Sequence, residues 1–210
     1  MDKDATIFVA GHKGLAGSAI WAHLEKSGYN KLVGLSSKDL DLTNREATFS
    51  AFKTLEPEVV IDAAALVGGI SANSKAPVDF LHTNLKIQLN LMEAAFEVGV
   101  ERLLFLGSSC IYPKMAHQPI PETELFRGPL EESNIGYAMA KITGVVQVQS
   151  YRRQHHLPWI SAMPTNLYGP KDNYDPNSSH VLAALILRFH QAKVASLPFV
   201  EVWGSGSALR

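Results

Sequence analysis

A glycine-rich turn directly after a short apolar segment is the feature that most restricts the fold of this chain. The segment from Ala5 to Ala10 is apolar and partly β-branched, which is typical of a buried parallel strand. It leads into Gly11-His12-Lys13-Gly14-Leu15-Ala16-Gly17, and a helical pattern then runs from Gly17 to Ser27. Because such a turn presents backbone N–H groups and the positive end of a helix dipole, it predicts a dinucleotide phosphate site.

Strand and helix patterns alternate along the rest of the chain. Further strands are predicted at residues 31–35, 59–61, 103–106 and 159–163 and just before Trp203, and further helices at 46–55, 79–98, 137–154 and 181–193. This alternation predicts an α/β fold with a Rossmann-type doubly wound parallel sheet, covered on both faces. The composition changes near Tyr168. We therefore expect a dinucleotide-binding domain over 1–168 and part of a smaller substrate domain over 169–210.

The charge and hydropathy patterns exclude several classes of function. The 19 basic and 20 acidic residues give a net charge of −1, so there is no general basic surface for nucleic acid or for an anionic membrane. The longest apolar run, Val181 to Leu187, is too short to cross a bilayer, and Met1 to Asp4 do not resemble a signal peptide. We expect a soluble, cytoplasmic protein. The single cysteine, Cys110, cannot form an internal disulfide, and the histidine spacing predicts no metal site.

The residues after the second predicted strand bear on the choice of cofactor. An NAD site usually places an acidic side chain there, about 20 residues beyond the turn, to bind the ribose 2′-hydroxyl. Here the sequence is Leu35-Ser36-Ser37-Lys38, and both Lys13 and Lys38 could face a 2′-phosphate. NADP(H) is therefore favoured over NAD(H). Asp39 and Asp41 follow closely and leave the alternative open.

Tyr137 and Lys141 are one helical turn apart on a predicted helix and would face the same side. A nearby ammonium group favours the phenolate and so lowers the pKa of a tyrosine. Ser108 or Ser109, at the end of the 103–106 strand, could hydrogen-bond a carbonyl oxygen in the same place. With the glycine turn, these residues predict an acid/base site beside a nicotinamide cofactor.

These motifs together resemble the extended short-chain dehydrogenase/reductase family. The resemblance rests on the glycine turn, Ala63-Ala-Ala, Val67-Gly-Gly-Ile70, Leu103-Leu-Phe-Leu-Gly-Ser-Ser-Cys-Ile-Tyr-Pro-Lys114, Tyr137-Ala-Met-Ala-Lys141, Met163-Pro-Thr-Asn-Leu-Tyr-Gly-Pro170 and Val202-Trp-Gly-Ser-Gly206. The Gly-Ser-Ser-Cys-Ile-Tyr-Pro-Lys stretch resembles the corresponding stretch of the family members that act on GDP-4-keto-6-deoxy-D-mannose. The resemblance therefore implies NADPH-dependent epimerisation at carbons 3 and 5 and reduction at carbon 4, which yields GDP-L-fucose.

The resemblance also implies roles for individual residues. Ser108 and Tyr137 would stabilise an enolate oxygen, and Tyr137 would protonate the alkoxide while Lys141 holds the nicotinamide ribose. Cys110 and His180 would exchange the protons of the epimerisations. Cysteine after a strand is also a common buried apolar residue, and His180 could instead cap the following helix or simply face solvent. The residues implied in cofactor binding are Gly11, His12, Lys13, Gly14, Leu15, Ala16, Gly17, Ser37, Lys38, Asp41, Leu106, Gly107, Ser108, Ser109, Lys141, Pro164, Thr165, Asn166, Leu167 and His180.

Arg188, Trp203 and Arg210 are at substrate-side positions by the same resemblance. The planar guanidinium of Arg188 suits pyrophosphate oxygens, whereas Trp203 could stack on a ring or fill the core. Leu66 stands where the family commonly has a lysine. Family members form homodimers through the helices at 79–98 and around Tyr137, so we expect a homodimer.

Family chains also continue well past the position of Arg210. We therefore expect exposed apolar surface in the partial substrate domain. Two alternatives to the GDP-sugar reaction stay open: an epimerase or dehydratase for another nucleotide sugar, and a truncated dinucleotide-binding protein without turnover.

Overall fold

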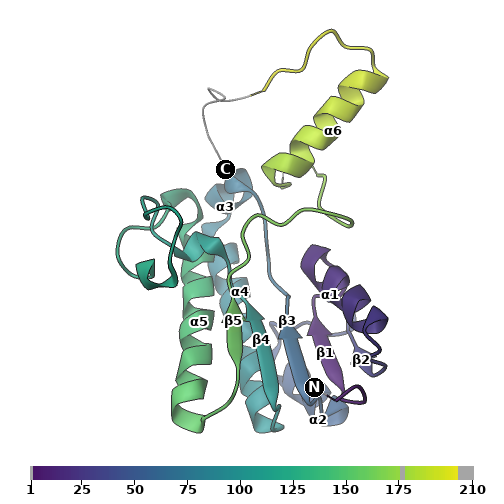
Figure 1. Cartoon of the computed structure of the whole chain (residues 1–210), viewed down its shortest axis with the longest axis vertical. Coiled ribbons are helices and arrows are strands. Elements are labelled where there is room, and N and C mark those ends of the chain that lie inside the picture. The colour runs from purple at the N-terminus through teal and green to yellow at the C-terminus, as the bar shows by residue number, and fades with distance from the viewer. Residues whose placement is uncertain (1, 176–177, 203–210) are drawn as a thin grey trace.

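Five parallel strands form the centre of the protein (Figure 1). The structure is a computed structural model that describes residues 2–175 and 178–202. The strands are β1 (Ile7–Ala10), β2 (Leu32–Val33), β3 (Val59–Asp62), β4 (Arg102–Leu106) and β5 (Ile160–Ala162), in the sheet order β2-β1-β3-β4-β5. Every neighbouring pair in this order is parallel. The predicted doubly wound parallel sheet is therefore confirmed.

Helices lie on both faces of the sheet, but unequally. They are α1 (Leu15–Lys26), α2 (Arg45–Leu55), α3 (Ile70–Lys75), α4 (Pro77–Glu97), α5 (Ile135–His155) and α6 (Val181–Val194), with short 3-10 helices η1 (Ser109–Ile111), η2 (Glu122–Glu124) and η3 (Glu132–Asn134). The chain steps from β1 to β2 in one direction and from β2 to β3 in the other. Since such crossovers are right-handed, α1 covers one face, and α2, α4 and α5 cover the other.

The strand alternation separates two apolar cores. Phe8 of β1 packs with Phe105 of β4 and with Phe52 of α2, in the larger core under α2, α4 and α5. The rings of Phe8 and Phe52 are 5.2 Å apart in an edge-on arrangement. On the opposite face, Ile7 and Val9 belong to a smaller core that α1 covers. The period-two alternation of a strand produces this division.

The carboxyl ends of β1 and β3 border the point at which the strand order reverses. The chain leaves β1 toward β2 on one side and returns to β3 on the other. Ligands of doubly wound sheets bind in the crevice outside such a point. Gly11 and Ala63, which directly follow β1 and β3, therefore lie at the expected binding crevice.

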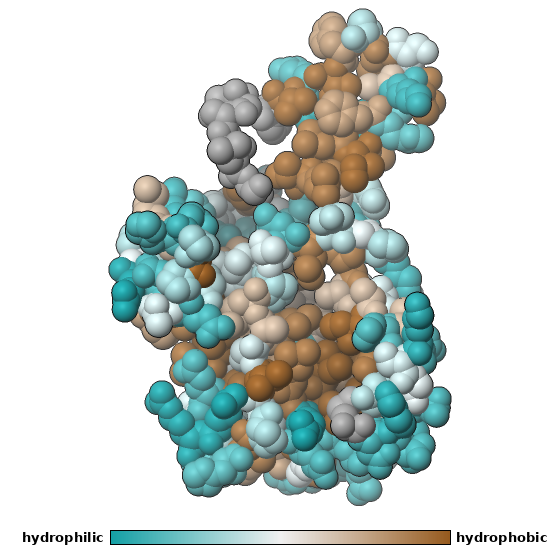
Figure 2. All heavy atoms as spheres, in the orientation of Figure 1, coloured by the Kyte–Doolittle hydropathy of each residue, from teal (hydrophilic) through white to brown (hydrophobic). Residues whose placement is uncertain are grey.

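On the face that carries α1, the sheet is less well covered over β4 and β5 than over β1 and β3. Figure 2 shows apolar side chains gathered over this face below α6. Ile160 of β5 is 51% exposed and pairs in register with the half-buried Leu104 of β4. Above the sheet, α6 has its own exposed apolar residues: Val181, Leu182, Ile186, Phe189 and Val194. The expected exposed apolar surface is thus present.

The element boundaries differ from the expectations in a few places. β2 has two residues instead of the five expected at 31–35, because only Leu32 and Val33 pair with β1 and a turn starts at Ser36. The polar helix α3 lacks an apolar periodicity and was not predicted. The strand expected before Trp203 is wrong, since 199–202 form no strand and Phe199 and Val202 are exposed. In the described ranges, no helix is both long and apolar enough to cross a membrane.

Candidate active site

The glycine turn joins β1 to α1 in a conformation that requires two of its glycines. Gly11 has φ +73°, and a Cβ there would lie 2.6 Å from the Ala63 carbonyl oxygen. A Cβ on Gly17 would lie 2.1 Å from the Gly11 carbonyl oxygen. Gly14 is the N-cap of α1, and the first turn of that helix has no acidic residue. Its N–H groups therefore suit a phosphate, and the turn fits a dinucleotide.

Charged side chains gather around the turn. Burial is the largest cause of the lowered pKa of His12, the positive charges of Lys13 and Lys171 add to it, and Asp39 opposes it. The imidazole ring of His12 packs against Gly34 and lies 5.4 Å from the ring of Trp21. Lys13 and Lys38 are exposed, as a contact with a 2′-phosphate would require.

The two carboxylates near β2 are hydrogen-bonded in local turns. Asp39 accepts hydrogen bonds from the backbone N–H and hydroxyl of Ser36, at 3.2 and 2.5 Å. Asp41 accepts them from the backbone N–H and hydroxyl of Thr43, at 2.9 and 2.7 Å. These bonds lower the pKa of both carboxyl groups, so each is ionised at neutral pH. Asp41, a predicted cofactor contact, is thus already engaged with its own loop.

The end of β4 and the start of α5 bring three predicted catalytic residues together. Ser108 is the N-cap of η1, and its hydroxyl accepts a hydrogen bond from the Cys110 N–H at 3.3 Å. Burial is the largest cause of the raised pKa of the Tyr137 phenol; the neighbouring Cys110 adds to it, and the neighbouring Ser108 hydroxyl opposes it. Ser108, Cys110 and Tyr137 therefore form one cluster. The thiol of Cys110 is free and half-buried.

The expected effect of Lys141 on Tyr137 is wrong for this arrangement. Burial raises the pKa of Tyr137 to about 12, and Lys141 is not among the causes of that shift. Its Nζ lies 5.8 Å from the centre of the Tyr137 ring and donates a hydrogen bond to the Leu106 carbonyl oxygen at 2.7 Å. The ammonium is thus held toward the sheet, and the phenol remains protonated at neutral pH.

The segment after β5 runs beside the segment after β4. The Gly107 N–H donates to the Ala162 carbonyl oxygen at 2.8 Å, and the Ser109 N–H donates to the Pro164 carbonyl oxygen at 3.1 Å. The predicted cofactor segment 164–167 therefore starts next to Ser109. Thr165, Asn166 and Leu167 are exposed.

His180 follows a segment that docks on the Gly68-Gly69 turn. The Gly69 N–H donates to the Ser178 carbonyl oxygen at 3.1 Å, and a Cβ on Gly69 would lie 2.9 Å from the Ser179 carbonyl oxygen. His180 is exposed at the N-cap position of α6, and its side chain makes no capping bond there. The side chain of His180 therefore does not cap the helix, and its exposure agrees with the alternative that it faces solvent.

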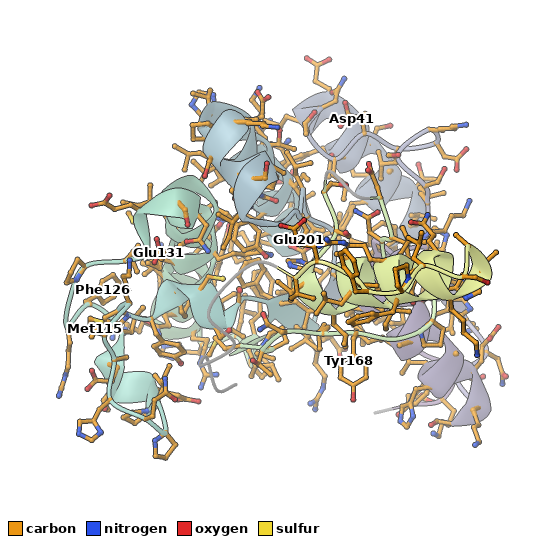
Figure 3. The ribbon with its side chains drawn as sticks, turned by 90° about the horizontal axis from the view of Figure 1, so that it is seen from above. Asp41, Met115, Phe126, Glu131, Tyr168 and Glu201 are labelled. Atoms are coloured by element: carbon orange, nitrogen blue, oxygen red, sulfur yellow. The ribbon has the colours of Figure 1, made fainter. Side chains whose placement is uncertain are left out.

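The predicted substrate side is only partly described. Arg188 donates a hydrogen bond to the Glu201 carbonyl oxygen, and Figure 3 shows Glu201 beside α6. Tyr168 points away from the molecule in the same view, while Met115 and Phe126 lie on the separate loop between η1 and η3. Trp203 and Arg210 lie outside the described residues.

Three residues of the site region were not identified from the sequence. Asp62 ends β3, and its carboxyl group is buried. The apolar run that precedes it in the sequence was the signal that could have indicated this burial. Asn84 of α4 binds both backbone polar groups of Leu66, at 2.8 and 3.0 Å. Lys171 is near enough to His12 in the glycine turn to act on its pKa. The loop that carries it crosses α1 at Gly169, where a Cβ would lie 3.9 Å from the side chain of Leu15. No sequence signal indicated that crossing.

Comparisons with known proteins agree with this geometry. The family model described as NAD dependent epimerase/dehydratase family matches residues 7–210. GDP-L-fucose synthase 1 of Arabidopsis thaliana is 55% identical over 209 residues, which cover 100% of this chain and 65% of that protein. The chain thus spans less than two thirds of the length of this relative.

Two solved structures are similar to the whole arrangement. One is a GDP-L-fucose synthetase from Naegleria fowleri bound to NADP, with a TM-score of 0.89, 33% identity and coverage of 100% of this chain and 69% of that one. The other is a GDP-mannoheptose C4 reductase from Campylobacter jejuni with NADP bound. Its TM-score is 0.86 at 40% identity, with coverage of 93% of this chain and 58% of that one.

Proposed function

The chain belongs to the NAD dependent epimerase/dehydratase family, and on this premise we propose that it converts GDP-4-keto-6-deoxy-D-mannose to GDP-L-fucose with NADPH. The observation that carries the proposal is the cluster of Ser108, Cys110 and Tyr137 at the carboxyl end of β4. It combines a proton donor for a carbonyl oxygen with a thiol that can exchange a proton at a neighbouring carbon. The names of the similar proteins support the same substrate class.

The cofactor would lie across the glycine turn. Gly11, Gly14 and Gly17 leave room for its pyrophosphate at the start of α1, and Lys13 and Lys38 supply positive charge for the 2′-phosphate. Both nearby carboxylates are bound to their own turns, which supports NADP(H) over NAD(H). When bound, NADPH supplies the hydride for carbon 4.

Reduction needs a proton for the carbon 4 oxygen, and Tyr137 is in the right protonation state to give it. Burial keeps its phenol protonated at neutral pH, and the neighbouring hydroxyl of Ser108 would orient the phenol. Ser108 can also hydrogen-bond the substrate carbonyl oxygen. Lys141, whose ammonium lies at the end of β4, would bind the nicotinamide ribose.

Epimerisation uses the same oxygen-binding groups. A proton next to a ketone is removed more easily when hydrogen bonds stabilise the enolate oxygen, which Ser108 and Tyr137 would supply. Cys110, beside Tyr137, would exchange a proton on one side of the sugar. The exposed His180 would act from the segment that docks on Gly69. Arg188, Trp203 and Arg210 would bind the GDP moiety from a partial substrate domain over 169–210.

The first experiment measures NADPH absorbance after GDP-4-keto-6-deoxy-D-mannose is added to the 210-residue chain. We expect consumption of NADPH and formation of GDP-L-fucose. Tyr137→Phe removes the proton donor and should slow reduction at least about 100-fold. Tyr112→Phe, which removes a half-buried phenol directly after η1, is the matched control and should retain activity. NADPH binding without consumption would instead support a dinucleotide-binding protein without turnover.

A second experiment separates epimerisation from reduction. In D₂O with NADP⁺ and no hydride donor, an epimerase incorporates deuterium at carbons 3 and 5. Cys110→Ser should reduce this exchange while NADPH binding stays unchanged. The similarity to a C4 reductase favours one specific alternative, a reductase without epimerisation on another GDP-sugar. Reduction of a keto-sugar without any deuterium exchange would support that alternative.

The outer faces of α4 and α5 support a homodimer. Val78, Leu89 and Phe96 form an exposed apolar stripe on α4, and Ile135, Met139 and Val146 form one on α5; these side chains are 39% to 60% exposed. Two copies of this face would form a four-helix bundle. Val146→Glu should shift the molecular mass from light scattering toward that of a monomer. Met115→Glu, at an 85% exposed loop residue, is the control.

We also place the protein in the cytoplasm. The proposed reaction requires the free thiol of Cys110, and thiols stay reduced in that compartment. Localisation of a tagged full-length protein by microscopy tests this. A signal confined to an oxidising compartment would contradict it.

A further inference from the structure

Asp62 is a buried charged residue that the reaction proposed above does not use. It is the last residue of β3 and is only 1% exposed. Its Oδ1 accepts a hydrogen bond from the Ala64 N–H at 3.2 Å, and its Oδ2 has no hydrogen-bond partner in the described part of the chain. A carboxylate in such a place raises the free energy of the fold unless another charge balances it.

The strand geometry directs Asp62 toward α5. Side chains alternate along a strand, so Asp62 shares a face with Val60, which belongs to the core under α4 and α5. The neighbour of Asp62 in register on β4 is Phe105. The Nζ of Lys141 lies 4.8 Å from the centre of the Phe105 ring. Asp62 and Lys141 therefore approach the same place, one from the sheet and one from the helix.

Lys141 is as deeply buried as Asp62 and also needs a counter-charge. Its side chain is 4% exposed, and its hydrogen bond goes to the Leu106 carbonyl oxygen, which carries no full charge. In the described ranges, no carboxylate oxygen lies within 4.0 Å of the Lys141 Nζ. Asp62 therefore acts on Lys141 by electrostatic attraction without a direct ion-pair contact. The phenol of Tyr137, whose ring centre is 5.8 Å from the Lys141 Nζ, is neutral, and Asp62 is the charged group that acts on the Lys141 pKa.

The two groups support each other's charged forms. Burial lowers the pKa of Lys141, and the negative charge of Asp62 opposes this. Burial raises the pKa of Asp62 to about 6, and the positive charge of Lys141 opposes it, as does the bond from Ala64. Each charge therefore moves the pKa of the other group back toward its ordinary value, which favours the ionised carboxyl group and the protonated amine.

We propose that Asp62 is a positioning residue for Lys141: its carboxylate is the buried counter-charge that keeps the ammonium protonated and in place between β4 and α5. Without it, the ammonium would be a lone charge in an apolar environment. The importance of this for catalysis rests on the proposed function, which assigns Lys141 to the nicotinamide ribose. The coupling between the two charges does not depend on any substrate.

The experiment is a direct titration of Lys141 in the 210-residue chain by NMR, with lysine labelled with ¹³C at Cε. Lys141→Met identifies the resonance. In Asp62→Asn, which preserves the side-chain shape, the Lys141 pKa should fall by about one unit or more. Asp39→Asn removes an exposed carboxylate bonded to Ser36 and should leave the Lys141 pKa unchanged. An unchanged Lys141 pKa in Asp62→Asn would overturn the proposal.

A reciprocal measurement covers the case in which Asp62→Asn fails to fold. Two coupled charges must shift each other by the same free energy, so Lys141→Met should raise the Asp62 pKa in a carboxyl-carbon titration. An unshifted Asp62 would refute the coupling. A wrong proposed function would give a different result. Both titrations would still show the coupling between Asp62 and Lys141, but addition of the GDP-sugar would leave the NADPH absorbance unchanged.

Discussion

Replacement of Gly17 by alanine tests the geometry of the glycine turn most directly. The added Cβ would lie 2.1 Å from the Gly11 carbonyl oxygen, 2.6 Å from the Gly11 carbonyl carbon and 3.0 Å from the His12 Cα. All three are backbone atoms, which cannot rotate away as a side chain can. The first turn of α1 must therefore move away from the Gly11 carbonyl group by roughly 1 Å.

Two opposing effects set the size of the loss. Overpacking of this kind costs about 1–3 kcal/mol. Alanine at a helical position regains about 1 kcal/mol relative to glycine. We therefore expect the free energy of unfolding to fall by about 0–2 kcal/mol. The effect on cofactor binding should be larger, because displaced N–H groups lose charge-assisted hydrogen bonds of about 1.5–3 kcal/mol each, or at least tenfold in affinity.

Urea denaturation measures the stability of the variant, and NADPH fluorescence measures the dissociation constant. Glu25→Ala is the control, since Glu25 is an exposed residue near the other end of α1 and its replacement leaves the turn unchanged. It should bind NADPH with an affinity close to that of the parent. If Gly17→Ala binds NADPH as tightly as Glu25→Ala, the argument from close packing at the turn is refuted.

Three further predictions concern single side chains. Lys38→Ala should weaken NADPH binding about tenfold and leave NADH binding nearly unchanged in the same titration; equal losses for both cofactors would argue against a 2′-phosphate contact. As the pH rises from about 4 to about 6, the free energy of unfolding of the parent should fall by roughly 1–3 kcal/mol, because the buried Asp62 keeps its proton in this range while the unfolded chain releases it. Urea curves of Asp62→Asn should lack this loss. Asn84→Ala leaves the buried polar groups of Leu66 unpaired and should cost about 2–4 kcal/mol in urea denaturation, whereas a loss near zero would contradict the role of those hydrogen bonds.

The fold class was predictable because its signals are local. A buried parallel strand is a short apolar run, and each of the helices that were predicted has an apolar face or a terminal glycine within its own sequence. The glycine turn could be recognised from spacing alone, since it depends on residues that are adjacent in the chain. The helix α3 and the absent strand at 199–202 lacked such a signal, because short polar helices and edge strands depend on what packs against them.

The candidate site was predictable where strand ends place residues together. Ser108 and Cys110 follow β4 directly, and Tyr137 begins the helix that packs behind it, so their meeting follows from the order of the elements. The protonation states did not follow. The spacing of Tyr137 and Lys141 indicated a lowered phenol pKa, but burial outweighs an ammonium that the Leu106 carbonyl oxygen holds toward the sheet.

The sequence by itself therefore determined the alternating elements, the dinucleotide turn and the residue types of the acid/base cluster. Only the tertiary structure placed Lys171 near His12 and Asp62 within electrostatic range of Lys141. The physical reason is that both relations join residues far apart in the chain, across a loop crossing or between neighbouring layers. Burial, which sets the charge of Tyr137 and Asp62, also belongs to the assembled molecule and not to any local segment.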